Sequence, residues 1–270
     1  MIVVDYICTQ IDFPLCRFVS KEACKGMCRS EMIREARINS PTVLILLTVI
    51  IGLTTRMIKH VQNLCASIGR AEMSLFFTLY NLSNVLSLVL MSLRHRLNER
   101  LMLLCTTAQL VFANSCIFSL LVGAITMDIF VTKFGLESTT ILYLSVSIYG
   151  FINTIVIFFG LAIKEPISIF VLVFCCNLVF VYAYFILQVK KLNYNKGEIW
   201  AYGTLFLALV CFMISSMPIF IGSEMISILT DKYLDNLFFH QLFLFCAVVM
   251  IHKFWLSVYD YEVESYLLEL

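Results

Sequence analysis

Charged residues are scarce in this chain of 270 residues: Asp, Glu, Lys and Arg together make up 14%, whereas hydrophobic residues make up 61%. So few polar side chains cannot cover the surface of a soluble domain of this size, and the mean hydropathy of +0.93 agrees. Because the 19 basic and 18 acidic residues nearly balance and the basic ones form no stripe, capture of nucleic acid is excluded. The composition therefore predicts a membrane protein.

Histidine is also rare, with four residues in the whole chain. A metal-dependent hydrolase within the membrane needs several His and acidic side chains aimed at one point. The histidines show no such spacing, since the first two are expected in loops and the last two lie far apart in one span: His60, His95, His240 and His252. We therefore expect no catalytic group, no metal and no cofactor.

Charge is missing from the middle of every apolar stretch, where an ion-coupled transporter keeps its functional acid or base. Transporters also tend to break helices at matched positions in two halves, but Pro218 interrupts one span alone and no internal repeat is visible. Pro41 and Pro166 stand at the starts of spans, where proline is tolerated. A small-molecule transporter is thus a minor alternative.

Long apolar runs are what the chain does contain. A hydrocarbon core about 30 Å thick takes about 20 helical residues to cross, and seven stretches qualify: 38–55, 73–93, 101–127, 138–163, 166–189, 199–223 and 236–259. The first span has a longer alternative that extends past Arg56. The seven stretches lack the alternation of β-barrel strands. The predicted fold class is all-α, a polytopic membrane protein with a seven-transmembrane-helix bundle and short loops. Its parts are an N-terminal segment 1–37, the membrane domain 38–259 and an acidic tail 260–270.

The positions of the cysteines indicate the orientation in the membrane. The distribution of lysine and arginine does not decide it, because the count favours one orientation with the N-terminal segment included and the opposite one without it. Four cysteines crowd into the first 28 residues, as suits an oxidising compartment: Cys8, Cys16, Cys24 and Cys28. We expect disulfides among them in one of three pairings, with a zinc site or free thiols as alternatives. The N-terminus is then lumenal and the C-terminus cytosolic. The other seven are expected to be buried apolar residues: Cys65, Cys105, Cys116, Cys175, Cys176, Cys211 and Cys246.

Uncharged polar residues stand within the spans and can hydrogen-bond one helix to another in lipid: Asn81, Asn84, Gln109, Asn114, Asn153 and Asn177. The third span also carries Ser115, Ser119 and Gly123 at four-residue spacing, a face of small residues that allows close approach of helices. Two interpretations stay open. These residues pack the bundle internally, or they dock helices of another membrane protein.

Three stretches resemble the fungal chitin synthase export chaperone family in order and spacing: "CTQIDFPLC" at 8–16, "IGRAEMSLFFTLYNLSNVLSLVL" at 68–90 and "YLDNLFFHQLFLFCAVVMIHKFWLSVYDYEVE" at 233–264. The matching positions are Cys8, Pro14, Leu15, Cys16, Gly69, Arg70, Glu72, Tyr233, Leu234, Asp235, Leu237, Phe238, Phe239, Lys253 and Trp255. The sequence departs from the family in its short basic link "RHRLNER" and in His252, where the family pattern has tyrosine.

The resemblance implies a seven-span protein of the endoplasmic reticulum with a lumenal N-terminus, and no enzyme. Members of the family bind a polytopic chitin synthase, keep it from aggregating and promote its export to the cell surface. The implied partners are thus a chitin synthase client and the lipid bilayer. A seven-helix receptor of another class is the main alternative, although receptors that couple to cytosolic partners usually have larger loops or tails.

The C-terminal end combines an anchor with an acidic tail. Lys253 and Trp255 are expected where the last helix leaves the bilayer, with the ammonium at the lipid phosphates and the indole in the headgroup layer. Beyond them, Asp260 and Glu262 belong either to a solvated amphipathic helix end or to a signal for the export coat, because "DYE" resembles a di-acidic cargo motif.

Overall fold

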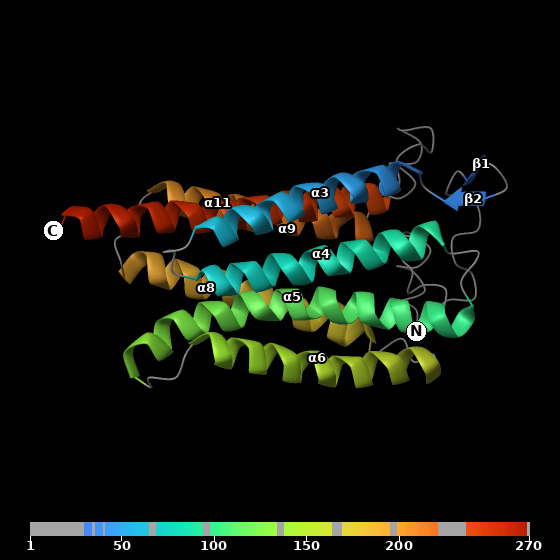
Figure 1. The fold of residues 1–270 in the computed structure, drawn as a ribbon, viewed down its shortest axis with the longest axis horizontal. Coiled ribbons are helices and arrows are strands. Elements are labelled where there is room, and N and C mark those ends of the chain that lie inside the picture. Colours follow the sequence, from blue (N-terminus) through green and yellow to red (C-terminus); the bar gives the residue numbers. More distant parts are fainter. Residues whose placement is uncertain are drawn as a thin grey trace.

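The computed structural model describes residues 30–33, 36–39, 41–64, 69–93, 98–133, 138–163, 169–194, 199–220 and 236–268. A short antiparallel hairpin, β1 (Ser30–Ile33) and β2 (Ala36–Asn39), comes first and was not predicted. The helices follow in the order α3 (Pro41–Asn63), α4 (Arg70–Ser92), α5 (Glu99–Lys133), α6 (Ser138–Ile163), the π-helix η1 (Val171–Cys176), α8 (Asn177–Tyr194), α9 (Ile199–Phe220) and α11 (Asn236–Leu268) (Figure 1).

Seven helical stretches within the described residues are long and apolar enough to cross a membrane, which confirms the predicted fold class. They are 41–63, 70–92, 99–126, 139–163, 171–194, 199–218 and 236–258, the fifth being η1 and α8 together. Pro41 occupies the first turn of α3, where its missing N–H costs no hydrogen bond, and Glu72 lies in the first turn of α4.

The first span is longer than the charge-free run predicted. α3 continues past Arg56 and Lys59 to Asn63, so the prediction that His60 lies in a loop was wrong, since His60 is in the last turn. Long basic side chains near a helix end keep their charge at the interface, so a lysine or arginine does not mark where a membrane helix stops.

Two other features bear on the predicted boundaries. Pro218 lies inside α9, two residues before Phe220, the last residue of this helix that the structure describes, and not in mid-span. The membrane span of α11 ends at Val258, close to the predicted 259, and the helix continues to Leu268, as the interpretation of the tail as a helix end expects. The segment predicted as an acidic tail thus begins as a continuation of the last membrane helix.

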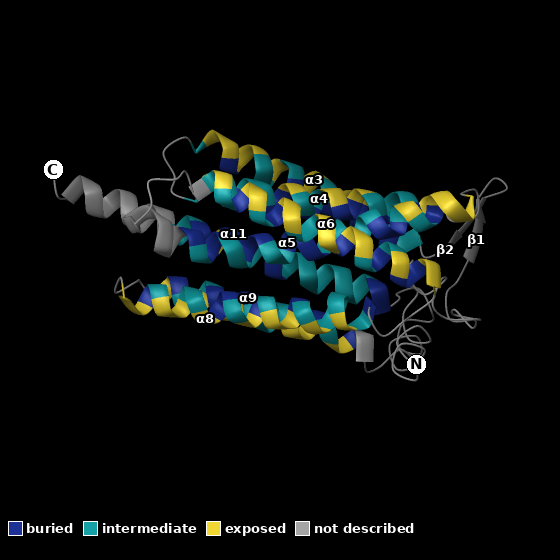
Figure 2. Ribbon diagram, turned by 90° about the horizontal axis from the view of Figure 1, so that it is seen from below, coloured by how far each residue is buried: buried dark blue, intermediate teal, exposed yellow. Residues whose placement is uncertain are grey.

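α4 and α5 form the centre of the bundle. In each, 44% of the most apolar window is buried, against 22–28% for the other five spans. α3 packs on one side of α4, α6 packs on the far side of α5, and α8 lies against α5, while α9 and α11 form a close pair that also contacts α3 (Figure 1). Exposed residues gather on the outer faces of α6, α8 and α9, where lipid would lie (Figure 2).

The bundle has two ends, which we name after their described segments. The hairpin end holds β1 and β2 and the starts of α3, α5 and α11. The tail end holds the end of α3, the start of α4 and the C-terminal part of α11 (Figure 1).

Candidate functional site

Three asparagines join α5, α6 and α8 inside the membrane span. Asn177 Nδ2 donates to Asn114 Oδ1 at 2.7 Å and to the carbonyl of Val173 at 2.7 Å. Asn114 Nδ2 lies 3.5 Å from Asn153 Oδ1, and Asn153 Nδ2 donates to the carbonyl of Tyr149 at 2.9 Å. All three side chains are buried. The predicted hydrogen bonding between helices is therefore present, and it serves the inside of the bundle.

A π-helix places Asn177 in this network. The wide turn Val171–Cys176 ends directly at Asn177, which has ordinary helical angles of φ −64° and ψ −39°. One extra residue in a helical turn rotates the chain beyond it by about 100°, so the turn decides which face of α8 meets α5. Nothing in the residues of this stretch marks it in advance, because "VLVFCC" is apolar throughout.

Small residues bring the neighbours of α5 into close contact. A Cβ at Gly123 would lie 3.2 Å from Glu72 Cβ on α4, and a Cβ at Gly150 on α6 would lie 3.3 Å from Ser115 Oγ. Ser115 and Ser119 are buried. The small-residue face of α5 is thus occupied within the chain, which favours the internal-packing interpretation over docking of a foreign helix on this face.

α4 directs a second polar stripe into the bundle. Tyr80, Asn84 and Ser87 follow each other on one face and are 4–7% exposed. Neighbouring positions fix the direction of this face, since Asn81 Nδ2 donates to Thr55 Oγ1 on α3 and Ser83 Oγ donates to a carbonyl of α5. The hydroxyl of Tyr80 and the side-chain amide of Asn84 are buried beside each other, and neither the hydroxyl nor the Nδ2 makes a hydrogen bond within 3.5 Å. Such groups are costly in a low-dielectric interior.

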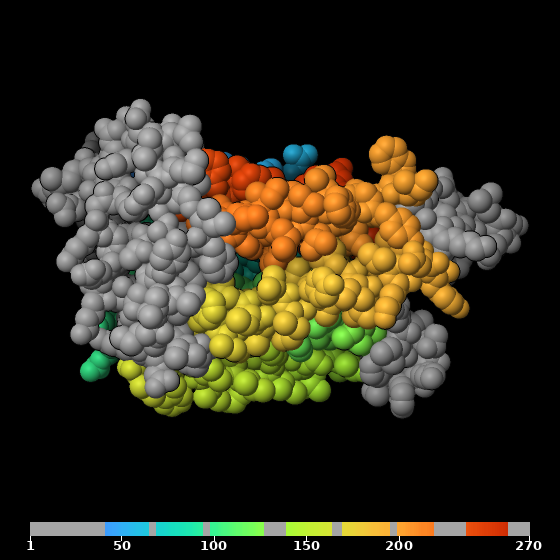
Figure 3. All heavy atoms as spheres, turned by 180° about the vertical axis from the view of Figure 1, so that it is seen from behind, coloured from blue at the N-terminus to red at the C-terminus, as the bar shows by residue number. Residues whose placement is uncertain are grey.

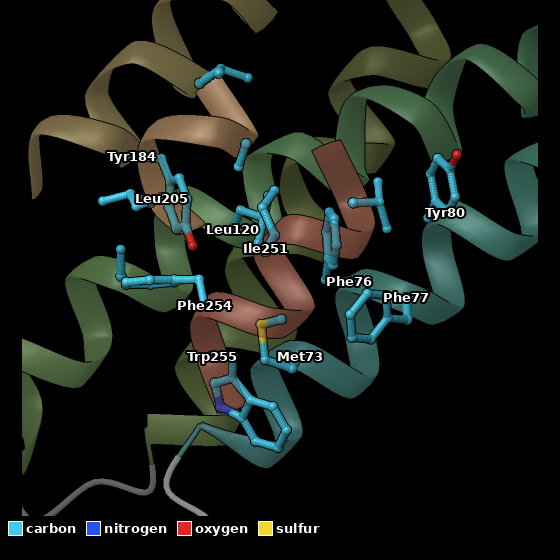
Figure 4. Packing of buried hydrophobic residues seen from close by; sticks show 14 of the residues in the cluster. Met73, Phe76, Phe77, Tyr80, Leu120, Tyr184, Leu205, Ile251, Phe254 and Trp255 are labelled. Carbon is cyan, nitrogen blue, oxygen red and sulfur yellow. The ribbon is translucent and has the colours of Figure 1, made fainter. Parts of the chain in front are cut away.

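An aromatic cluster connects α3, α4 and α11 at the tail end. The ring of His252 lies 5.6 Å from that of His60 and 5.5 Å from that of Phe77, both edge-on, and 6.4 Å from that of Trp255. His252 is 9% exposed, and its Nε2 has no partner. Figure 4 shows the neighbouring side chains of the same core, with the indole of Trp255 beside Met73 at the start of α4.

The residues 69–72 form the start of α4. Gly69 precedes the helix with φ 77°, a left-handed conformation that other residues adopt at a cost. Arg70 is exposed, and Glu72 packs its stem on Gly123. A carboxylate in the first turn also suits the positive end of the helix dipole.

The last helix shows one expected and one unexpected side chain. Lys253 is exposed, as an interfacial lysine should be. Trp255 is only 7% exposed, so the prediction that its indole lies among the lipid headgroups was wrong. The reason is helical geometry: Trp255 shares the face of His252, which packs against α3 and α4, whereas Lys253 points the other way.

Other motif positions lie at the hairpin end or outside the described residues. Leu237 is buried beside Val43 and Leu47 of α3, and the rings of Phe238 and Phe239 lie 5.6 Å apart. The structure does not describe the remaining positions of the predicted disulfide and family motifs: Cys8, Pro14, Leu15, Cys16, Cys24, Cys28, Tyr233, Leu234 and Asp235. Asp260 and Glu262 lie in the helical extension of α11, and their side chains are not described.

Metal-binding side chains do not gather in the part of the chain that the structure describes: no group of three or more His, Cys, Asp or Glu residues is close enough to hold an ion there. Six cysteines in that part are unpaired thiols. Cys116 is buried as predicted. The prediction of burial is wrong for Cys175, which is exposed, and holds only in part for four half-buried residues: Cys105, Cys176, Cys211 and Cys246. Cys65 lies outside the described residues.

The comparison with known protein families covers almost the whole chain. The family model described as "Chitin synthase export chaperone" matches residues 3–266. The chain belongs to this family. The family is one of chaperones and not of enzymes.

Curated members of the family agree with the match. The protein named "Chitin synthase export chaperone" from Phaeosphaeria nodorum is 25% identical over 281 residues, which cover 96% of this chain and 82% of the relative. Proteins with the same name from Coccidioides immitis and Emericella nidulans are each 24% identical and cover 96% and 93% of this chain and 83% and 80% of their own. No solved structure matches the chain.

Two positions that carry the resemblance to the chitin synthase export chaperone family hold helices together. Glu72 of α4 packs against Gly123 of α5, and Trp255 of α11 packs beside Met73 at the start of α4. Sequence reasoning missed the pairing of His60 with His252 and the stripe of Tyr80 and Asn84. A tyrosine followed four residues later by an asparagine in an apolar span was the available signal.

Proposed function

We propose that this chain escorts a chitin synthase: it binds the polytopic enzyme in the endoplasmic reticulum and promotes its folding and export to the cell surface. The observation that carries the proposal is the family match over residues 3–266, together with relatives of the same name that cover nearly all of the chain. A helix bundle suits this work, because an escort covers the membrane surfaces of its client and needs no reacting group.

Contacts between helices in lipid are individually weak, so an escort needs many of them to recognise its client. An interhelical hydrogen bond is worth about 0.6 kcal/mol on average, so specific recognition of the client has to add up many contacts. Apolar side chains cover the outer faces of α6, α8 and α9 and supply a large area for them (Figure 2). Single substitutions on these faces should therefore weaken client binding only mildly.

The proposed location is the endoplasmic reticulum membrane, with the N-terminus lumenal and the C-terminus cytosolic. Basic residues outside the N-terminal segment support this orientation, because most of those on the described helices stand at the tail end: Arg56, Lys59, Arg70, Lys190, Lys191 and Lys253. Arg100 is the described helical one at the hairpin end. An excess of Lys and Arg in short connections marks the cytosolic side. With the N-terminal segment included the count favours the opposite orientation, so the proposal depends on the cysteines of the first 28 residues. Contact of the export coat with Asp260 and Glu262 belongs to the same proposal.

The test is to extract the full-length protein from fungal membranes with a gentle detergent and identify what it carries. A polytopic chitin synthase should be enriched over an abundant, unrelated polytopic enzyme of the plasma membrane, which serves as the matched control. In cells that lack the escort, the synthase should stay in the endoplasmic reticulum while the control enzyme still reaches the surface. Normal surface delivery of chitin synthase in those cells would overturn the proposal.

A further inference from the structure

Three basic side chains stand around the contact that joins α3 to α11 at the tail end, which we name the α3/α11 seam. His60 of α3 meets His252 of α11 there, with ring centroids 5.6 Å apart. Arg56 precedes His60 by one helical turn, so the two share a face of α3, and Lys59 follows Arg56 by three residues. On α11, Lys253 follows His252 directly. The histidine contact thus brings cations of the first and the last span together (Figure 1).

These cations have no acidic neighbour among the side chains that the structure describes. Arg56, Lys59 and Lys253 are all exposed. The described acidic side chains are Glu72, which packs on α5, and Glu99, at the start of α5 at the other end of the bundle. Like charges one turn apart, as on α3, repel each other. An anion from outside the chain would relieve that repulsion.

Depth in the membrane indicates where this anion comes from. The two spans end at Asn63 and Val258, so Arg56 and Lys253 stand about 10 Å and about 8 Å before those ends. Long basic side chains at such depths lay their stems along the hydrocarbon and reach outward with their charges. The charges therefore converge on the headgroup layer, in which the phosphates of lipids are the abundant anions.

The outer side of α3 continues the seam toward the middle of the bilayer as an apolar strip. Val49 and Leu53 lie one turn apart, Arg56 follows Leu53 by three residues, and the two apolar side chains are 51% and 43% exposed. A Cβ at Gly52, between them, would meet nothing within 4 Å. Cations above an exposed apolar strip match a lipid molecule, with a charged headgroup above its acyl chains.

We propose that the α3/α11 seam binds one anionic phospholipid whose headgroup carries a phosphate beyond the one that joins it to the glycerol. The Arg56 guanidinium can hold a phosphate through two parallel hydrogen bonds, while Lys59 and Lys253 add point charges. Basic sites between membrane helices on the cytosolic side bind such headgroups, and the tail end is cytosolic in the proposed orientation. The proposal goes beyond the escort function and does not depend on it.

The other basic side chains of the tail end lack this arrangement and supply a matched control. Arg70 stands alone at the start of α4. Lys190 and Lys191 are consecutive on α8, so their side chains point about 100° apart. α8 also lies on the face of the bundle away from α3, beside α9 (Figure 3). These three residues carry the same total charge at the same end of the bundle, but not at a seam of two helices.

The test measures lipid binding to the full-length protein in detergent by native mass spectrometry. The probe is dioctanoyl phosphatidylinositol 4-phosphate, and dioctanoyl phosphatidylcholine is its control. One phosphoinositide should bind per protein at concentrations at which phosphatidylcholine does not. Inorganic phosphate at the same concentration should not displace it, because the acyl chains contribute to binding.

Substitutions locate the site. Replacement of Arg56, Lys59 and Lys253 by glutamine should weaken binding on the order of a hundredfold, since each cation near an anionic lipid contributes about fivefold. Arg70→Gln, Lys190→Gln and Lys191→Gln together should change it by no more than about twofold. Lys59→Arg with Lys253→Arg keeps both charges and should retain binding. All these side chains lie at the surface or near it, so thermal midpoints without the phosphoinositide should stay close to that of the unaltered protein.

Four results would overturn the lipid site. They are equal binding of the two lipids, full displacement by inorganic phosphate, unchanged binding after the three seam substitutions, and equal losses in both glutamine triples, which would show a diffuse surface charge. None of them bears on the escort function, because the client is absent from the measurement. Loss of binding in the seam triple alone, with the arginine variant still binding, would support the site.

Discussion

The imidazole ring of His252 on α11 meets that of His60 on α3 edge-on, with centroids 5.6 Å apart and planes at 74°. Phe77 of α4 contacts the same histidine, also edge-on. One buried ring thus connects three membrane helices that lie far apart in the sequence. The contacts need an aromatic ring at position 252, and they make no use of its Nε2, which has no partner.

His252→Ala should destabilise the bundle, because it removes three ring contacts and leaves a cavity; we expect a loss of about 1–3 kcal/mol in the free energy of unfolding. His252→Tyr, the residue of the family pattern, should keep the ring and cost little. Thermal unfolding in detergent, followed by size-exclusion chromatography, measures both. Equal destabilisation by the two variants would show that the imidazole itself is required.

Gly123→Ala should destabilise the contact of α5 with α4, because the new Cβ would lie 3.2 Å from Glu72 Cβ and 3.3 Å from its Cγ. Overpacking of this kind costs about 1–3 kcal/mol. Gly52→Ala and Gly203→Ala are the matched controls, since a Cβ at either position meets nothing within 4 Å. Both controls should be neutral or stabilising, because alanine favours the helix. Thermal midpoints of the three variants in one detergent decide the matter.

Asn114→Ala and Asn177→Ala should each lower stability, since the two side chains share a hydrogen bond of 2.7 Å. A double-mutant cycle measures their coupling, for which we expect about 0.6 kcal/mol and at most about 1.7 kcal/mol. Strictly additive effects would mean that the bond contributes nothing. Asn63→Ala, at the exposed end of α3, controls for the loss of an asparagine from a membrane helix.

The cysteines of the first 28 residues remain predicted to form disulfides. Peptides from membrane-derived protein, analysed by mass spectrometry without reduction, should contain bridges among Cys8, Cys16, Cys24 and Cys28. Reduction before digestion is the control and should release them. Four unmodified thiols would contradict a lumenal N-terminus and with it the proposed orientation.

Replacement of both Asp260 and Glu262 by alanine should retain the protein or its client in the endoplasmic reticulum, if these acids contact the export coat. The matched control is Glu264→Ala with Glu269→Ala, which removes the same charge from the same part of the chain. Fluorescence imaging of chitin synthase in living cells gives the readout. Normal delivery with the first pair replaced, or equal retention with both pairs, would count against a specific signal.

The seven spans were predictable because apolar length is a direct requirement of the bilayer. The sequence predicts that Asn114 and Asn177 hydrogen-bond to other helices, since an amide in lipid needs a hydrogen bond. It does not predict which helices they join, because that depends on the rotation of each helix about its axis. Lys59 shows a second limit: a charge interrupts an apolar run without ending the helix, so the apolar run alone placed the end of α3 too early, and the alternative that extends past Arg56 is confirmed.

Packing between distant segments was the least predictable part. Trp255 reads from the sequence as an interfacial residue, yet helix rotation buries it against α4. The sequence shows Tyr80 only as a tyrosine in an apolar span, and the burial of its hydroxyl beside Asn84 follows only from the placement of the neighbouring helices. No count of residue types contains such contacts.

The π-helical turn Val171–Cys176 rotates the residues that follow it in the fifth membrane span relative to those that precede it. Before it, Ile169 packs with Leu161 of α6 and Leu90 of α4, and after it Asn177 reaches Asn114. Deleting one residue of the turn would restore uniform winding but would swing one of these two partners about 100° out of place. The extra residue of the π-helical turn therefore sets the rotation between the two parts of this span. Its deletion would break either the apolar contact of Ile169 or the amide contact of Asn177.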